Sequence, residues 1–280
     1  MADMDGVMLR EETLHDCKVT SVTIQSEQAA KTLNKSVGTY ITIQANATLD
    51  KLSDVLPVGE CLAEVLDRVL HPYYHGKLCV CGMGNRRVPC DSLGPEVTYS
   101  LPLKMYSGRE GNFCDVCSFD PGVSMTTNID TEKIVGGVIK AVGADCLLLI
   151  DSSMTQDISR LSRTIQLSTA GGVNACLSGR KADWSALGVP VLSLVVPTII
   201  PLSVLNPEQE TRDEMLTSTT VKDVIAAAGS IIAYAILRAC WPSLSKAECF
   251  IFSKANKDPI PFSAVLGEAF EIAPEASATP

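Results

Sequence analysis

Two aspartates that follow short apolar runs are the candidate chemical groups of this sequence. Asp151 comes directly after the apolar residues 146–150, and Asp91 lies in the glycine- and proline-rich loop that follows Cys81. If both runs are strands of one open α/β sheet, their carboxyl ends lie at the edge where ligands bind. Two carboxylates brought together repel, so one keeps its proton near neutral pH while the other stays ionised. Such a pair can activate a water and protonate a leaving group.

Each aspartate also has a plainer interpretation, because Asp often caps the helix that follows a strand. Spacing by itself favours that structural role for both residues. Pro89, Gly94 and Pro95 restrict the loop that carries Asp91, and Gly82 and Gly84 allow a tight exit from the preceding strand. Both interpretations therefore stay open, and what separates them is whether the two side chains meet.

Other chemistries have weaker support. Gly82 and Gly84 resemble the start of a dinucleotide-binding motif, but Arg87 occupies the place of its third glycine, so we expect no nucleotide cofactor. The chain has neither a Gly-x-Ser-x-Gly elbow nor the Asp-Thr-Gly or Asp-Ser-Gly motif of pepsin-like proteases. Cys114 and Cys117 have a metal-like spacing without a second clean pair, so we expect no structural zinc.

Composition limits the class of protein. The chain has 280 residues and a net charge of −9, which argues against nucleic acid bound on a basic face. Its eleven cysteines are an odd number, some within apolar runs, as expected for free thiols in a reducing cytoplasm. The acidic N-terminus has no apolar signal-peptide core. Prolines interrupt the charge-free stretch 184–207, and 224–237 covers only 14 residues, so we expect no membrane span.

The elements that must position the aspartates follow from hydrophobic periodicity. Residues 19–24 and 39–45 alternate like strands, whereas the runs at 78–81, 146–150 and 189–196 are continuously apolar. Continuous runs separated by amphipathic helices indicate strands covered on both faces. We therefore predict an α/β fold with a mainly parallel central sheet and helices on both faces. The predicted helices lie at 26–33, 58–70, 131–142 and 220–239, within a single domain of residues 1–272 and a flexible tail of 273–280.

Several ordered motifs resemble one known family, the germination proteases, which are endopeptidases that degrade small acid-soluble spore proteins when endospores germinate. The resemblance covers about residues 6–205 and is strongest from Gly82 to Pro95. It is also carried by Gly6-Val-Met-Leu-Arg-Glu-Glu, Gly38-Thr-Tyr-Ile-Thr-Ile, Leu149-Ile-Asp-Ser-Ser, Arg163-Thr-Ile-Gln-Leu and Val196-Pro-Thr198.

The resemblance implies a soluble, cytoplasmic homotetramer of the spore core with a fold similar to the hydrogenase-maturation peptidases, a phosphorylase/hydrolase-like fold. It implies an aspartate pair as the catalytic groups, at Asp91 and Asp151, with no cofactor and small acid-soluble spore proteins as substrates. Asn85 and Ser152 are the candidate substrate-binding residues beside them. Metal-assisted peptide hydrolysis and a catalytically inactive paralogue that only binds proteins are the alternatives.

Some positions depart from the family pattern. Arg86 and Arg87 stand where the loop usually reads Trp-Asn, and residues 199–202 lack the usual aspartate after Val196-Pro-Thr198. Family precursors are zymogens with an N-terminal pro-segment, and this sequence starts downstream of the place expected for it. These departures bear on substrate choice and on activity.

Overall fold

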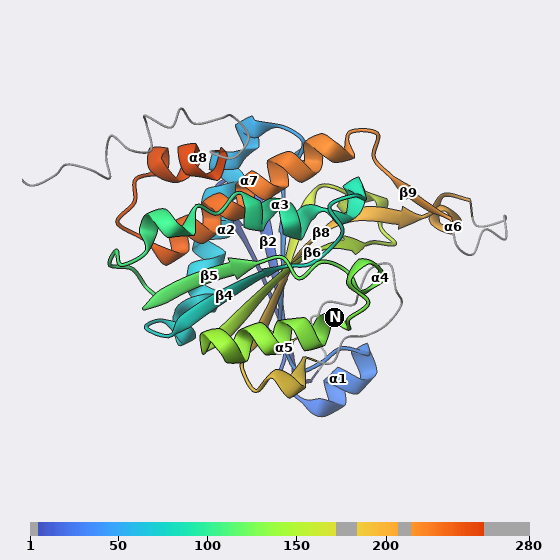
Figure 1. The fold of residues 1–280 in the computed structure, drawn as a ribbon. Helices are drawn as coiled ribbons and strands as arrows, with labels where there is room; N and C mark the ends of the chain where they lie inside the picture. Colours follow the sequence, from blue (N-terminus) through green and yellow to red (C-terminus); the bar gives the residue numbers. More distant parts are fainter. Residues whose placement is uncertain (1–4, 172–183, 207–213, 255–280) are drawn as a thin grey trace, which may run out of the picture.

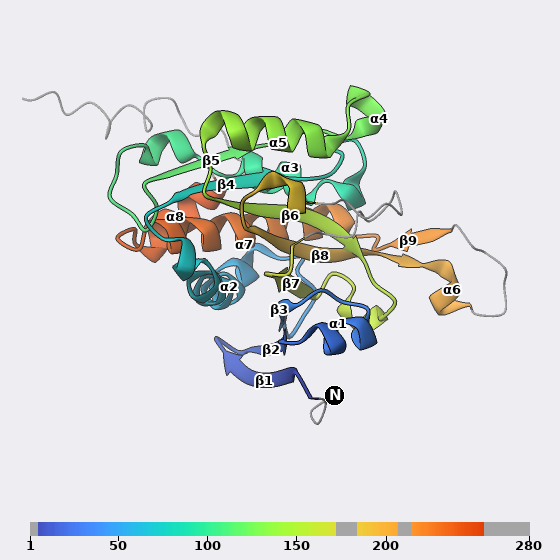
Figure 2. The same cartoon turned by 90° about the horizontal axis from the view of Figure 1, so that it is seen from below.

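The computed structural model describes residues 5–171, 184–206 and 214–254. One nine-stranded sheet runs through this part in the order β1-β2-β3-β7-β8-β6-β4-β5, with β9 paired to β8. Figures 1 and 2 show the sheet from two directions. The strands are β1 (Val7–Leu14), β2 (Cys17–Ile24), β3 (Gly38–Gln44), β4 (Lys77–Gly82), β5 (Asp115–Phe119), β6 (Cys146–Met154), β7 (Thr164–Ser168), β8 (Val191–Pro201) and β9 (Met215–Thr217).

The sheet is mixed, so the prediction of a mainly parallel sheet was wrong. Strands β5, β4, β6 and β8 are parallel neighbours. Strands β1, β2, β3, β7 and β8 pair antiparallel, as do β8 and β9. The continuous apolar runs correctly mark parallel strands, which are buried on both faces. The alternating segments at 19–24 and 39–45 belong to the antiparallel half instead, where one face is more open to solvent.

Helices cover both faces of the sheet, as predicted. In Figure 1, α2, α3, α7 and α8 lie on one side, while α5 and α1 lie on the other. The predicted helices correspond to α1, α2, α5 and α7. The helices are α1 (Glu27–Leu33), α2 (Val55–Leu70), α3 (Leu93–Tyr99), α4 (Ser124–Thr127), α5 (Thr131–Val142), α6 (Leu202–Leu205), α7 (Val221–Cys240) and α8 (Lys246–Lys254).

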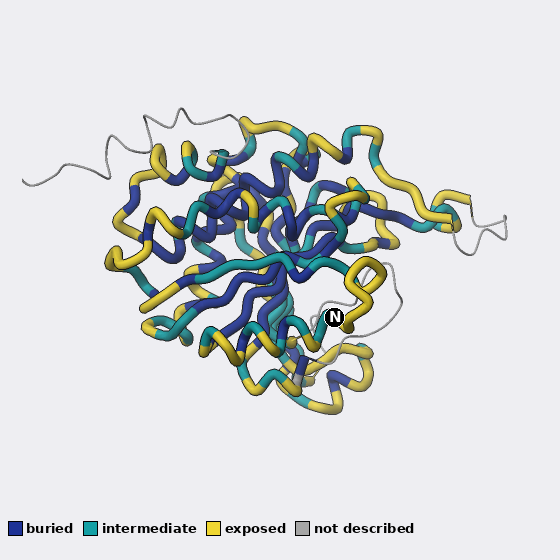
Figure 3. Tube along the Cα trace, in the orientation of Figure 1, coloured by how far each residue is buried: buried dark blue, intermediate teal, exposed yellow. Residues whose placement is uncertain are grey.

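Helix α7 is the central element of the larger apolar core. It packs against α2, α3 and α8, and Figure 3 shows its dark blue, buried path through the molecule. By length and composition α7 could cross a membrane, yet 83 % of its most apolar stretch is buried inside the protein. We therefore describe it as a core helix. Trp241 follows the last residue of α7 and packs against Tyr106, with the two ring centres 5.0 Å apart.

The two faces of β6 enter different parts of the core. Leu148 and Ile150 belong to the large cluster beneath α2 and α7. Leu147 and Leu149 belong to a smaller cluster with Val135 of α5. Because successive side chains of β6 point to opposite faces, both faces of the strand are covered by apolar side chains up to Asp151. The likeness to hydrogenase-maturation peptidases and the single-domain boundary at residue 272 stay predictions, since residues 255–280 lie outside the described part.

Candidate active site

Backbone contacts that require glycine hold the loop after β4 against the beginning of α3. An alanine Cβ at Gly82 would lie 2.2 Å from the carbonyl oxygen of Gly94, and one at Gly94 would lie 2.2 Å from that of Met83. The Met83 N–H also donates to the Ile150 carbonyl at 2.7 Å, one residue before Asp151. The backbone of the loop is therefore in direct contact with the start of α3 and with β6.

Asp91 ends a short 3-10 helix, η3 (Pro89–Asp91), which packs against β6, β8 and α7. The residue is 9 % exposed. Its carbonyl accepts the Asn85 N–H at 2.8 Å. Gly84 has a φ of +121° and approaches so closely that a Cβ there would lie 2.0 Å from the same carbonyl oxygen. These contacts close the loop on itself and fix the backbone of Asp91.

Asp151 lies within β6 and is 7 % exposed. It pairs with Val195 of the neighbouring strand β8. Its Oδ1 accepts the N–H of Ser152 at 2.8 Å. Strand alternation places Asp151 on the same face as Leu149, while Ile150 faces the core beneath α7. The carboxyl group is therefore held by its own strand at the carboxyl end of the parallel half of the sheet.

The structure brings Asp91 and Asp151 within range of each other's charge. Burial raises the pKa of Asp91 to about 6, although a hydrogen bond from the Asn85 N–H opposes the shift. Burial, and then the charge of Asp91, raise the pKa of Asp151 to about 8 against the effect of the Ser152 N–H. Repulsion between two like charges in a buried site pushes the pKa values of the two groups apart. Near neutral pH the pair therefore holds one proton.

Asn85 and Ser152, the residues predicted to bind substrate, have other contacts in the structure. Asn85 Oδ1 accepts the Arg87 N–H at 3.0 Å, which forms a side-chain turn within the loop. Ser152 is completely buried, and alternation places it on the face of Ile150, opposite Asp151. The first residue shapes the loop and the second faces the core, and their role in substrate binding stays a prediction.

Two hydroxyl side chains near the pair were not predicted from the sequence. Ser153 lies two residues after Asp151, on the same face of β6, and its Oγ is buried without a hydrogen-bond partner among the described residues. Thr198 of β8 donates its hydroxyl to the Cys90 carbonyl at 2.6 Å. A sequence signal for Thr198 exists in Pro197, because a proline inside a strand marks an edge or a bulge.

Arg86, one of the departures from the family pattern, links the loop to its surroundings. Its Nε donates to Oδ2 of Asp120 at 2.9 Å, just beyond the end of β5. Its guanidinium group also lies over the ring of Tyr99, 5.6 Å from the ring centre. Asp120 in turn accepts the Gly122 N–H at 2.8 Å. The substituted arginine therefore anchors the outer side of the loop.

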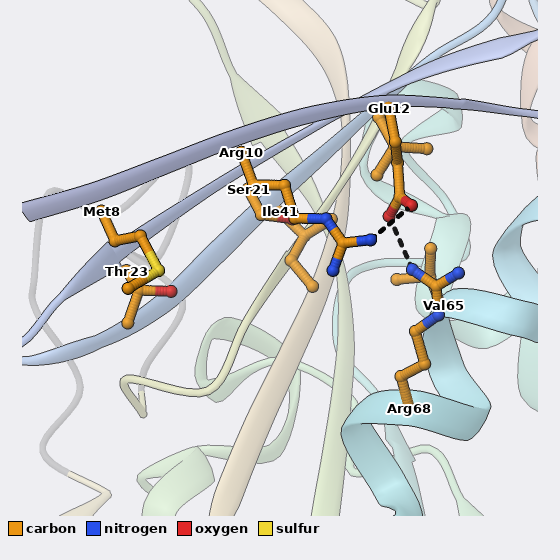
Figure 4. Close-up of a pocket in the computed structure, with 9 residues that line it drawn as sticks. Met8, Arg10, Glu12, Ser21, Thr23, Ile41, Val65 and Arg68 are labelled. Atoms are coloured by element: carbon orange, nitrogen blue, oxygen red, sulfur yellow. Dashed lines mark hydrogen bonds and ion pairs between the residues drawn. The ribbon is translucent and has the colours of Figure 1, made fainter. Parts of the chain in front are cut away.

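Two pockets in the described part lie away from the aspartates. One, of about 240 Å³, opens between α2 and the strands β1 to β3. Figure 4 shows Glu12 within it, bound to both Arg10 and Arg68. The other, of about 310 Å³, lies beside β5 and Trp241. The two aspartates are instead buried side chains, and the backbone of Asp91 contacts the loop at Gly84 and Asn85.

The part of the chain that the structure describes contains no group of three or more His, Cys, Asp or Glu side chains that could hold a metal ion. The aspartate pair therefore has no third protein ligand of these types within residues 5–171, 184–206 and 214–254. The ten cysteines in these residues are all free thiols, as the sequence predicts.

Comparison with known proteins agrees with these motifs. A family model described as "Germination protease" matches residues 1–222. Proteins named germination protease are similar to this chain in Caldanaerobacter subterraneus subsp. tengcongensis, with 33 % identity over 208 residues, and in Clostridium perfringens, with 29 % over 209. A third, from Oceanobacillus iheyensis, is 30 % identical over 211 residues.

The matched part covers 71 % of this chain in all three cases. It spans 64 % of the first two relatives and 57 % of the third, so the chain matches about three fifths of their length. The matched region includes β4, β6, β8 and the loop between Gly82 and Pro95, which build the site. From its motifs and the family model together, the chain belongs to the germination protease family.

Proposed function

We propose that this protein is an endopeptidase that hydrolyses peptide bonds with Asp91 and Asp151 as its catalytic pair. One observation carries the proposal: two buried carboxyl groups from distant parts of the chain interact at the carboxyl ends of parallel strands, with pKa values raised to about 6 and about 8. Perturbed acids of this kind are frequent at functional sites. Membership of the germination protease family supports the same conclusion.

The burial of the two groups suggests their roles. Ionised Asp91 takes a proton from a water molecule as that water attacks the scissile carbonyl carbon. Protonated Asp151 donates a hydrogen bond to the carbonyl oxygen as negative charge develops on it. The proton acquired by the pair then passes to the leaving amine as the C–N bond breaks. Because coupled carboxyls titrate as a unit, the singly protonated pair is the active form whichever side chain holds the proton.

The substrate, location and assembly complete the proposal. Family membership supports small acid-soluble spore proteins as substrates and the spore core as the place of action. We also propose a homo-oligomer, supported by the exposed apolar side chains of Met8 and Leu9 on the edge strand β1. Sedimentation of the purified chain measures its assembly, and a monomer at all concentrations would contradict that part.

The test compares Asp91→Asn and Asp151→Asn with the wild type on a purified spore-protein substrate. Each variant should lose at least about a hundredfold in kcat, because each removes one partner of the proton transfer. Wild-type activity should be highest between about pH 6 and pH 8 and fall on both sides. Circular dichroism checks folding, and wild-type rates in both folded variants would refute the mechanism. Activity that disappears with a chelator and returns with a divalent metal would favour the metal-assisted alternative.

A further inference from the structure

Strand β8 contains a bulge beside the catalytic loop. Ser153 of β6 pairs with Pro197 of β8, but the next residue, Met154, pairs with Ile199. Thr198 is therefore the extra residue, without a partner on β6. Bulges of this kind are common next to active sites, where they redirect a strand or a side chain. Proline at 197 suits the position because a proline has no N–H to offer a ladder.

Thr198 faces the loop that carries Asp91. Leu194 and Val196 of the same strand lie in the core beneath α7. The helix η3 contacts β8 as well as β6 and α7. Thr198 is completely buried, and its Oγ1 donates to the carbonyl of Cys90 at 2.6 Å. Cys90 directly precedes Asp91, so this bond ends one residue from the carboxyl-bearing position.

A second hydrogen bond fixes Thr198 from the other side. The Thr217 hydroxyl of β9 donates to the Thr198 carbonyl at 2.7 Å. Ser162 also donates its N–H to the carbonyl of Pro197 at 2.7 Å. These two hydrogen bonds hold the backbone of the bulge at the edge of β8 where β7 and β9 pair, and the bulge offers one hydroxyl to the loop. Loss of the Thr198 hydroxyl would leave the Cys90 carbonyl without this donor, which costs free energy unless the loop shifts.

We infer that Thr198 is a positioning residue, which holds the loop of residues 89–91 so that Asp91 faces Asp151. The inference rests on the proposed function for its effect on catalysis, but not for its effect on the loop. Thr198 acts through the backbone of Cys90 and touches no reacting atom. This role requires a hydroxyl group at position 198, which serine also supplies and valine does not.

The experiment compares Thr198→Val, Thr198→Ser and Thr217→Val with the wild type. We expect Thr198→Val to lower kcat about fivefold to tenfold, as the loss of one buried hydrogen bond would, with a much smaller change in KM. Thr198→Ser should keep most of the activity. Thr217→Val is the matched control, because it removes a hydroxyl bond to the same bulge without touching Cys90. If Thr198→Val does not fold, Thr198→Ala takes its place.

A second readout separates this inference from the proposed function. Carboxyl titration followed by ¹³C NMR should show the pKa of Asp91 moving from about 6 towards its ordinary value in Thr198→Val but not in Thr198→Ser. If the wild type cleaves no peptide while this difference appears, the proposed function fails and the positioning role stands. Unchanged titration and unchanged kcat in Thr198→Val would overturn the inference. An equal loss in Thr198→Val and Thr217→Val, with unaltered titration, would also overturn it.

Discussion

The chemistry of Asp91 depends on backbone atoms as much as on its own carboxyl group. Its carbonyl accepts the Asn85 N–H, and the backbone of Gly84 passes close beside the same oxygen. Its carboxyl is buried with few donors, which is why its pKa rises rather than falls. Any side chain added to this tight crossing must move Asp91 relative to Asp151.

Gly84→Ala should therefore abolish most of the peptidase activity. The new Cβ would lie 2.0 Å from the Asp91 carbonyl, and the φ of +121° is unfavourable for alanine. Gly108→Ala is the matched control, because Gly108 also has a positive φ, of +80°, but open space around its Cβ position. Cleavage rates of the two folded variants decide the matter. Equal activity in both would show that the contact with Asp91 is unimportant.

Ser153→Ala and Ser152→Ala should separate the two faces of β6. Ser153 shares the face of Asp151, and its Oγ is buried with no protein partner in the described residues. Ser153→Ala should thus alter KM or the pH profile of cleavage by severalfold. Ser152 faces the core, so Ser152→Ala should change the free energy of unfolding more than catalysis. Steady-state kinetics over pH 5–9 measure both variants, and a catalytic effect confined to Ser152→Ala would contradict this assignment.

At the level of the elements, α2 and α7 cross at a position reserved for a small residue. A Cβ on Gly59 of α2 would lie 2.7 Å from the ring of Tyr234 of α7. The Tyr234 hydroxyl in turn donates to Glu60, and Arg238 and Lys246 bind the same carboxylate. The crossing therefore combines a close apolar contact with a polar network at its rim.

Gly59→Ala should lower the free energy of unfolding by about 1–3 kcal/mol, because overpacking outweighs the better helix propensity of alanine. Gly137→Ala in α5 is the control, since no atom beyond its chain neighbours and the nearby backbone of its own helix lies within 4 Å of its Cβ position. That variant should gain about 0.5–1 kcal/mol from helix propensity. Urea denaturation gives both values. A higher free energy of unfolding in Gly59→Ala would contradict this prediction, because it would show that α2 and α7 accommodate the extra methyl group without loss of stability.

The elements with a strong hydrophobic period were predictable, and those without it were not. The helix predicted at 131–142 coincides with α5, and the apolar run at 146–150 opens β6. Strand β1 was missed because its side chains are mostly exposed, which gives the sequence Val7–Leu14 little apolar contrast. The short helix α3 was missed because Gly94 and Pro95 at its start suggest a loop.

At the scale of the whole molecule, the sequence predicted the parallel strands better than the order of the sheet, and the catalytic role of Asp91 and Asp151 stays a prediction. The apolar runs predicted Asp91 and Asp151 just after two strands, whereas Asp151 lies inside β6 and Asp91 lies in η3 after the loop that follows β4. The charge of Asp91 nevertheless acts on Asp151. The antiparallel half depends on pairings such as that of β3 with β7, between residues 120 or more positions apart. No local pattern encodes such a pairing, because alternation shows that a strand is half-buried but not which strand lies beside it.

The buried pair also couples the stability of the whole molecule to pH. The pKa of Asp151 rises from 3.8 to about 8 on folding, so the native state binds more protons than the unfolded state between these values. The stabilisation by its protonated form is complete below about pH 4 and is lost as the pH rises through 8. Asp91 acts in the same direction, with its loss centred near pH 6.

Asp151→Asn should therefore be more stable than the wild type at pH 8 and similar to it at pH 4. At about 1.4 kcal/mol for each unit of pKa shift, the gain at high pH is a few kcal/mol. Asp157→Asn is the control with the opposite sign, because hydrogen bonds with Ser159 lower the pKa of that exposed carboxyl. Urea unfolding at several pH values gives the difference between variant and wild type. A difference that stays constant from pH 4 to pH 8 would show that Asp151 is not a buried acid of raised pKa.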